Sequence, residues 1–179
     1  MSWVVRAPDR PLERAEKKTY TRVRRVLWDY EPLRASHAEI FIDIDGDQVL
    51  LRGRVRTMPQ KLIASGIVAR MPEVGEVINE LIADPEVVRS VADALAQDER
   101  TAAYVLRVEA RHGVVTLRGE VPSQAVQDAA MATAASLPLV ATVRNLTTIG
   151  GDPRPSVALA RPTALADVPD PAAVSDARP

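Results

Sequence analysis

The chain has 179 residues, 46% of them hydrophobic, no cysteine and a formal net charge of −1. Without cysteine, disulfides, thiolate catalysis and cysteine-based zinc or iron–sulfur sites are excluded. A net charge so close to zero argues against a general nucleic-acid binder. Only one Phe, two Trp and three Tyr are present, so any core must consist mainly of Val, Leu, Ile and Ala.

Residues 1–12 are predicted to form an N-terminal arm. They lack a basic start followed by an apolar run, so we expect no export signal and a cytoplasmic protein. No stretch approaches the roughly 18 apolar residues of a membrane span. A helix is predicted from about Glu13 to Pro32, because apolar and aromatic residues recur there at helical spacing. They are Tyr20, Val23, Val26, Leu27 and Tyr30.

A β-hairpin is predicted next, since the pattern changes to period two with Ile40, Ile42 and Ile44 on one face. Asp45-Gly46 supplies the turn, and a second strand follows over 49–55. Met58-Pro59 then opens a helix running to about residue 70. A third strand is expected around residues 74–81.

A second set of elements follows with almost no linker. Asp84-Pro85-Glu86 is predicted to provide an N-cap, a first-turn proline and an acidic first turn. A helix over 85–97, strands over 104–111 and 114–121, a helix over 123–136 and a strand over 139–148 complete the set. From residue 150 to 179 the chain is rich in Pro and Ala without periodicity, which predicts a disordered tail.

The two sets are copies of one unit. Gly53 recurs as Gly119 and Asn79 as Asn145, and the shift is constant, since 119 − 53 and 145 − 79 both equal 66. Two copies are too few for a solenoid, which needs about three or more. The sequence therefore predicts two sister domains, at 13–83 and 84–149.

Two motifs repeat in register. The first copy reads Gly46-x-x-Val49-x-Leu51-x-Gly53-x-Val55, then Pro72-x-Val74-x-x-Val77-x-Asn79. The second reads Gly113-Val114-Val115-x-Leu117-x-Gly119-x-Val121, then Pro138-x-Val140-x-x-Val143-x-Asn145.

With these motifs the chain resembles a tandem of BON domains, a bacterial family named for an osmotically induced periplasmic protein and for nodulation. The resemblance implies an α+β fold of two αββαβ domains, each a three-stranded mixed sheet with two helices on one face. It also implies a binding module that associates with phospholipid or envelope components, often under osmotic or other stress. The family includes a cytosolic potassium-binding protein, so a sensor of a potassium-like ion is an alternative function.

Catalysis is not predicted. The only histidines, His37 and His112, fall in a loop and a hairpin turn at non-equivalent positions of the copies. The acidic residues around Gly46 are better explained by a hairpin turn than by a calcium loop, since Arg54 stands where a bidentate Glu is required. We expect no cofactor and no metal site.

The opening helix carries the first candidate binding surface. Lys17, Arg24, Arg25 and Trp28 lie on the side away from its apolar stripe. An indole within a basic face suits an anionic phospholipid surface, because the ring favours the interface and each cation contributes about 1 kcal/mol. The protein would then contact a membrane peripherally. The alternative is that Trp28 packs against the sister domain or the arm carrying Trp3.

The uncovered face of the first sheet is the second candidate. There Phe41 and Leu50 are predicted to lie beside Arg52 and Arg54, an arrangement typical of a protein contact. The partner would be the sister domain or another chain, by self-association or as an adaptor. The repeated asparagines are predicted to satisfy backbone groups at the third strand. The repeated glycines, Gly53 and Gly119, are predicted to admit the helix packed above them.

Overall fold

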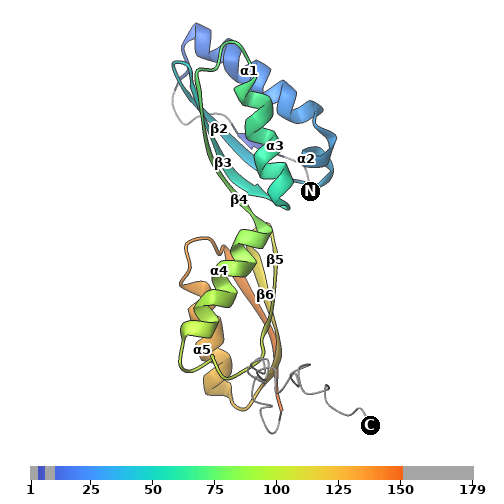
Figure 1. Ribbon diagram of the computed structural model, residues 1–179, viewed down its shortest axis with the longest axis vertical. Helices are drawn as coiled ribbons and strands as arrows, with labels where there is room; N and C mark the ends of the chain where they lie inside the picture. Colours follow the sequence, from blue (N-terminus) through green and yellow to red (C-terminus); the bar gives the residue numbers. More distant parts are fainter. Residues whose placement is uncertain (1–3, 7–10, 151–179) are drawn as a thin grey trace, which may run out of the picture.

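The computed structural model describes residues 4–6 and 11–150. Residues 1–3 and 7–10 of the predicted arm and residues 151–179 of the predicted tail lie outside this range. Two α+β units follow one another along the long axis of the molecule (Figure 1). The tandem αββαβ prediction is confirmed.

In the first unit, two principal helices cover one face of a mixed sheet (Figure 1). Its elements are β1 (Val4–Arg6), α1 (Arg14–Asp29), α2 (Glu31–Ala35), β2 (Glu39–Asp45), β3 (Gln48–Val55), α3 (Met58–Ala69) and β4 (Glu76–Ala83). The sheet order is β1-β2-β3-β4. Strands β2 and β3 are antiparallel and form the predicted hairpin, whereas β4 runs parallel to β3. The predicted three strands are thus present, and β1 extends them by pairing parallel to β2.

The second unit repeats this order without the extra strand. It comprises α4 (Asp84–Gln97), β5 (Arg107–Arg111), β6 (Val114–Val121), α5 (Gln124–Ala135) and β7 (Thr142–Ile149). Strands β5 and β6 are antiparallel, and β7 is parallel to β6. Two of its strands are shorter at their starts than predicted, because residues 104–106 and 139–141 lie in connecting segments.

The first core is aliphatic, as the composition requires. Ile40 and Ile42 of β2 face Val23 and Leu27 of α1, and all four are buried. This alternation in the strand and helical spacing in α1 confirm the predicted inward faces. One boundary prediction is wrong. α1 ends at Asp29, and Pro32 lies in the first turn of α2, where its missing N–H and fixed φ are tolerated.

The repeated asparagines make the same bonds in both units, as predicted. Asn79 donates from Nδ2 to the carbonyl of Lys61 at 2.9 Å and accepts from the N–H of Leu81 at 3.2 Å. Asn145 donates to the carbonyl of Gln127 at 3.4 Å and accepts from the N–H of Thr147 at 3.1 Å. The two amides therefore tie β4 to α3 in the first unit and β7 to α5 in the second.

The glycine prediction is only half right. Gly53 and Gly119 have φ of +126° and +141°, and each does admit a close backbone neighbour. That neighbour is not the helix, however. An added Cβ would fall on the carbonyl oxygen of Glu39 in the first unit and lie 2.8 Å from that of Val105 in the second. The close neighbour of Gly53 is thus β2, the first strand of its hairpin, and that of Gly119 is the segment leading into β5.

The junction between the units contains no linker residue, as predicted, since β4 ends at Ala83 and α4 begins at Asp84. The N-cap, however, is Ala83 rather than Asp84. Glu86 satisfies the free N–H of Ala83 with its Oε2 at 2.8 Å. Asp84 is thereby released for a different contact, with the second hairpin.

Candidate functional site

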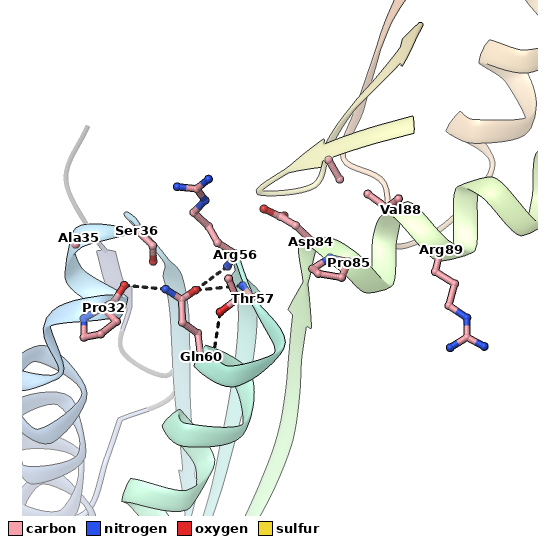
Figure 2. Close-up of a pocket in the computed structure, with 11 residues that line it drawn as sticks. Pro32, Ala35, Ser36, Arg56, Thr57, Gln60, Asp84, Pro85, Val88 and Arg89 are labelled. Atoms are coloured by element: carbon pink, nitrogen blue, oxygen red, sulfur yellow. Dashed lines mark hydrogen bonds between the residues drawn. The ribbon is translucent and has the colours of Figure 1, made fainter. Parts of the chain in front are cut away.

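A cleft of about 650 Å³ opens at the junction of the two units (Figure 2). Its walls come from α2 on one side and from α4 and β5 on the other, with the start of α3 between them. The lining residues are Pro32, Ala35, Ser36, Arg56, Thr57, Gln60, Asp84, Pro85, Val88, Arg89 and Ala110. Clefts between domains are frequent ligand sites because they combine two surfaces around one volume.

Gln60 secures the floor of this cleft. Its Oε1 accepts the N–H groups of Arg56 at 3.0 Å and Thr57 at 3.2 Å. Its Nε2 donates to the carbonyl of Pro32 at 2.8 Å (Figure 2). The amide is thus committed to joining α2 to the start of α3, and its role is structural.

Asp84 forms the far wall and is 8% exposed. Its Oδ1 accepts the N–H of His112, in the turn between β5 and β6, at 2.7 Å. Burial raises the pKa of this carboxyl, although the backbone N–H groups of His112 and Gly113 and the charges of His112 and Arg56 oppose the rise. Asp84 therefore anchors the second hairpin to α4.

Arg56 differs from its neighbours in the surroundings of its charged group. It is exposed, and within the described ranges 4–6 and 11–150 its guanidinium forms no hydrogen bond and no ion pair. The other arginine of the cleft, Arg89, extends away from the cavity (Figure 2) and lies 3.9 Å from Asp93.

Three contacts hold the two units against each other. Lys61 of α3 binds Glu86 of α4 at 2.8 Å. Arg54 donates from Nη1 to the carbonyl of Leu139 at 2.8 Å, and its guanidinium lies where a Cβ on Gly113 would be. Ile82 of β4 packs against the second core. These contacts hold together the two units that form the walls of the cleft.

The family model of the BON domain matches residues 21–85 and, a second time, residues 83–151. The chain belongs to the BON domain family. Its cleft therefore lies where two BON domains meet, and Asp84 stands in the overlap of the two matches. The predicted domain bounds at 13–83 and 84–149 stay predictions.

Solved structures share the fold of the BON pair. Both are of CdsD, described as a structural protein of the type III secretion system of Chlamydia trachomatis. The first is 14% identical to this chain and superposes with a TM-score of 0.55. The match covers 74% of this chain and 61% of the CdsD chain. The second, of the C-terminal domain of CdsD, is 15% identical with a TM-score of 0.52. This match covers 70% of this chain and 61% of the CdsD chain. The chain thus spans about three fifths of each. Comparison with curated proteins gives no match.

The predicted basic surface lies on α1 of the first BON domain. Arg24, Arg25 and Trp28 line one hollow of about 310 Å³ together with Thr21. Trp28 is 43% exposed, and the arm residue Trp3 lies outside the described residues. Lys17 does not line the hollow but lies one turn before Thr21, whose hydroxyl donates to its carbonyl at 2.8 Å.

The predicted protein-contact residues lie in two different environments. Phe41 is 38% exposed and Leu50 is half-buried on the open sheet face. Arg52 is beside Phe41 in register and binds Asp43 at 3.1 Å. Arg54 instead contacts the sister domain, one of the two partners that the sequence leaves open.

Sequence reasoning misses the cleft. Its walls include α2, which the sequence pattern does not predict, and Arg56 stands out only as one of several outward arginines. The missing linker at Ala83–Asp84 is the available signal. Among the described residues no three His, Asp or Glu side chains are grouped to hold a metal ion. In the same part of the chain, no helix has the length and apolar character needed to cross a membrane.

Proposed function

We propose that this tandem of BON domains is a non-catalytic binding module whose α1 surface binds anionic phospholipid. Membership of the family and the fold shared with a structural protein support a binding module rather than an enzyme. The observation that carries the lipid assignment is the hollow on α1, where Arg24, Arg25 and a 43% exposed Trp28 lie together.

The opposite side of α1 explains why these groups face outward. Val23 and Leu27 are fully buried in the first core, which fixes the rotation of the helix. Arg24 has no hydrogen-bond or ion-pair partner within the described part of the chain. Arg25 is 3.9 Å from Asp29, with both side chains well exposed, a distance at which such pairs contribute little. Both guanidinium groups are therefore available to lipid phosphates.

The expected affinity is modest. Lys17, Arg24 and Arg25 together contribute about 3 kcal/mol near an anionic surface, at about 1 kcal/mol per cation. A complex with a dissociation constant of 1 mM has a binding free energy of about 4 kcal/mol. These three charges alone would therefore give a dissociation constant in the millimolar range. Trp28 adds to this by entering the interface. Binding should therefore require excess lipid and weaken with salt.

Liposome co-sedimentation tests the proposal. The protein should sediment with vesicles containing phosphatidylglycerol but not with phosphatidylcholine vesicles, and it should be released at high salt. Arg24→Glu with Arg25→Glu, and separately Trp28→Ala, should reduce the bound fraction. The matched control is Arg107→Glu with Arg144→Glu, two arginines of the second sheet, which makes the same change in net charge.

If the control pair lost binding as strongly as the α1 pair, net charge rather than this surface would be responsible. Absence of binding to anionic vesicles would reject the lipid assignment. Unfolding temperatures in KCl and NaCl at equal ionic strength test the potassium alternative, for which only the potassium salt should stabilise.

A protein contact is the second candidate function. The exposure of Phe41 beside half-buried Leu50 favours it, and the shared fold with a protein described as a structural component adds support. Sedimentation velocity over a concentration series tests self-association. Phe41→Ser should dissociate any oligomer, whereas Leu62→Ser, at an exposed leucine of α3, should not.

A further inference from the structure

We infer that the cleft between the two BON domains binds a singly charged organic carboxylate with an apolar body. This site is separate from the α1 surface and does not depend on lipid binding. The inference rests on the guanidinium of Arg56, which has no hydrogen-bond or ion-pair partner among the described residues, on the apolar residues that line the cleft and on the contacts between the domains.

Arg56 provides the anion site. It follows β3 directly and precedes the capping residue Thr57, and both backbone N–H groups are held by Gln60. The base of the side chain is thus positioned, while the guanidinium has no hydrogen-bond or ion-pair partner anywhere in residues 4–6 or 11–150. A guanidinium offers a planar pair of donors that match the two oxygens of a carboxylate.

The walls next to Arg56 accept an apolar group. Pro32 and Ala35 of α2 line one side of the cleft and Pro85 and Val88 of α4 line the other, with the start of α3 between them (Figure 2). The other polar lining groups are committed elsewhere. Gln60 is engaged in the floor through its amide oxygen and one amide N–H, and the Ser36 hydroxyl donates to the carbonyl of Leu33 at 3.0 Å. An apolar chain can therefore lie between the proline-lined walls without leaving polar groups unpaired.

Asp84 limits the charge of the ligand. Its buried carboxylate lines the same cleft, accepts the N–H of His112 at 2.7 Å and interacts electrostatically with the charge of Arg56. It would repel a second negative charge placed beside Arg56. A monocarboxylate fits this balance, whereas a phosphate dianion or a dicarboxylate does not.

Isothermal titration with octanoate, below its micellar concentration, tests the site in the full chain. Octanamide keeps the chain but removes the charge, acetate keeps the charge but removes the chain, and inorganic phosphate supplies a dianion. Octanoate should bind saturably and roughly ten-fold or more tightly than each of the other three compounds. A ten-fold loss is the scale expected when a ligand lacks the hydrogen bond to a charged group or most of the apolar contact.

Variants locate the binding. Arg56→Gln should reduce octanoate affinity to that of octanamide, while Arg34→Gln, at an exposed arginine of α2 outside the lining, should leave it unchanged. Val88→Ser should weaken octanoate and octanamide alike. Arg24→Glu with Arg25→Glu should have no effect, which separates this site from the lipid proposal.

Absence of saturable octanoate binding would overturn the inference. So would equal affinity in the wild-type protein and in Arg56→Gln with an unchanged circular dichroism spectrum. If Arg56→Gln failed to fold, the octanoate affinity of Val88→Ser would decide instead. A ligand bound in the cleft must contact Val88, so an unchanged affinity in this variant would also overturn the inference. Tighter binding of phosphate than of octanoate would likewise reject the assigned ligand class.

Discussion

Lys61 in the first BON domain binds both carboxylate oxygens of Glu86 in the second, at 2.8 and 3.0 Å. The same carboxylate accepts the N–H of Ala83, and the carbonyl of Lys61 accepts the amide of Asn79. One ion pair thus connects β4 and α3 of the first domain to α4 of the second. Because no linker intervenes, this pair lies directly beside the point at which β4 passes into α4.

Lys61→Met should lower the free energy of unfolding by about 1 kcal/mol, the scale of a partly exposed ion pair with good geometry. Burial raises the pKa of Glu86, but its hydrogen bonds from Ala83 and Lys61 outweigh burial, and the net pKa is below the ordinary 4.5. The stabilisation is therefore present above about pH 4.5 and declines as the pH falls below it. Urea unfolding at several pH values checks this, and a variant effect that did not shrink in acid would contradict it.

Asp84 should show the opposite pH dependence. Burial raises its pKa above the ordinary 3.8, so its ionised form is disfavoured in the folded protein. Stability from this residue declines as the pH rises from about 3.8 through the folded pKa. Asp84→Asn should remove that dependence while keeping an acceptor for the His112 N–H. Asp84→Ala, which leaves that N–H without a partner, should be about 1–3 kcal/mol less stable than Asp84→Asn at every pH. Equal unfolding free energies for the two variants at neutral pH would exclude the hydrogen bond as the main contribution.

The two asparagines offer an internal comparison. Asn79→Ala and Asn145→Ala should each lower the free energy of unfolding by about 1–3 kcal/mol, because each leaves a half-buried carbonyl and a strand N–H without their side-chain partner. The first should cost more, since its bond to the helix carbonyl is 2.9 Å against 3.4 Å in the second domain. Chemical denaturation monitored by far-ultraviolet circular dichroism provides the measurement. Stability unaffected in both would show that water replaces these bonds.

Local pattern predicts most of the fold, although not β1 or α2. Period-two spacing in β2 and helical spacing in α1 identify the buried faces, and the 66-residue repeat alone predicts that Asn79 and Asn145 make equivalent bonds. These features depend on residues near one another in sequence, or on one element facing one core. The second copy adds an independent check on each element of the first.

The cleft cannot be predicted from local sequence pattern, because it depends on how one domain packs against the other. Alternation along β3 shows that Arg54 and Arg56 point outward, but not that the sister domain covers one of them. Arg54 reaches Leu139, 85 residues away, whereas Arg56 remains unpaired in the described part of the chain. Asp84 similarly contacts His112 across 28 residues. No local pattern encodes these separations.

Asp98 provides a last prediction, at the end of α4. Its carboxylate accepts the backbone N–H of Arg100 at 3.0 Å, the Arg100 guanidinium at 2.7 and 2.9 Å, and the Thr133 hydroxyl of α5 at 2.5 Å. The Arg100 and Thr133 hydrogen bonds hold the pKa of Asp98 well below its ordinary 3.8. Its contribution to stability is therefore complete above about pH 4 and is lost as the pH falls through the folded pKa.

Asp98→Asn should consequently destabilise the protein at neutral pH, and its difference from wild type should narrow in acid. Asp93→Asn is the matched control, because Asp93 also lies on α4 but only approaches Arg89, at 3.9 Å with both side chains exposed. Thermal unfolding of the three proteins between about pH 7 and pH 2 covers the range in which this contribution begins to be lost. Parallel curves for wild type and Asp98→Asn would show that the ionised carboxylate does not stabilise the connection between α4 and α5. A narrowing specific to Asp98→Asn would show that it does.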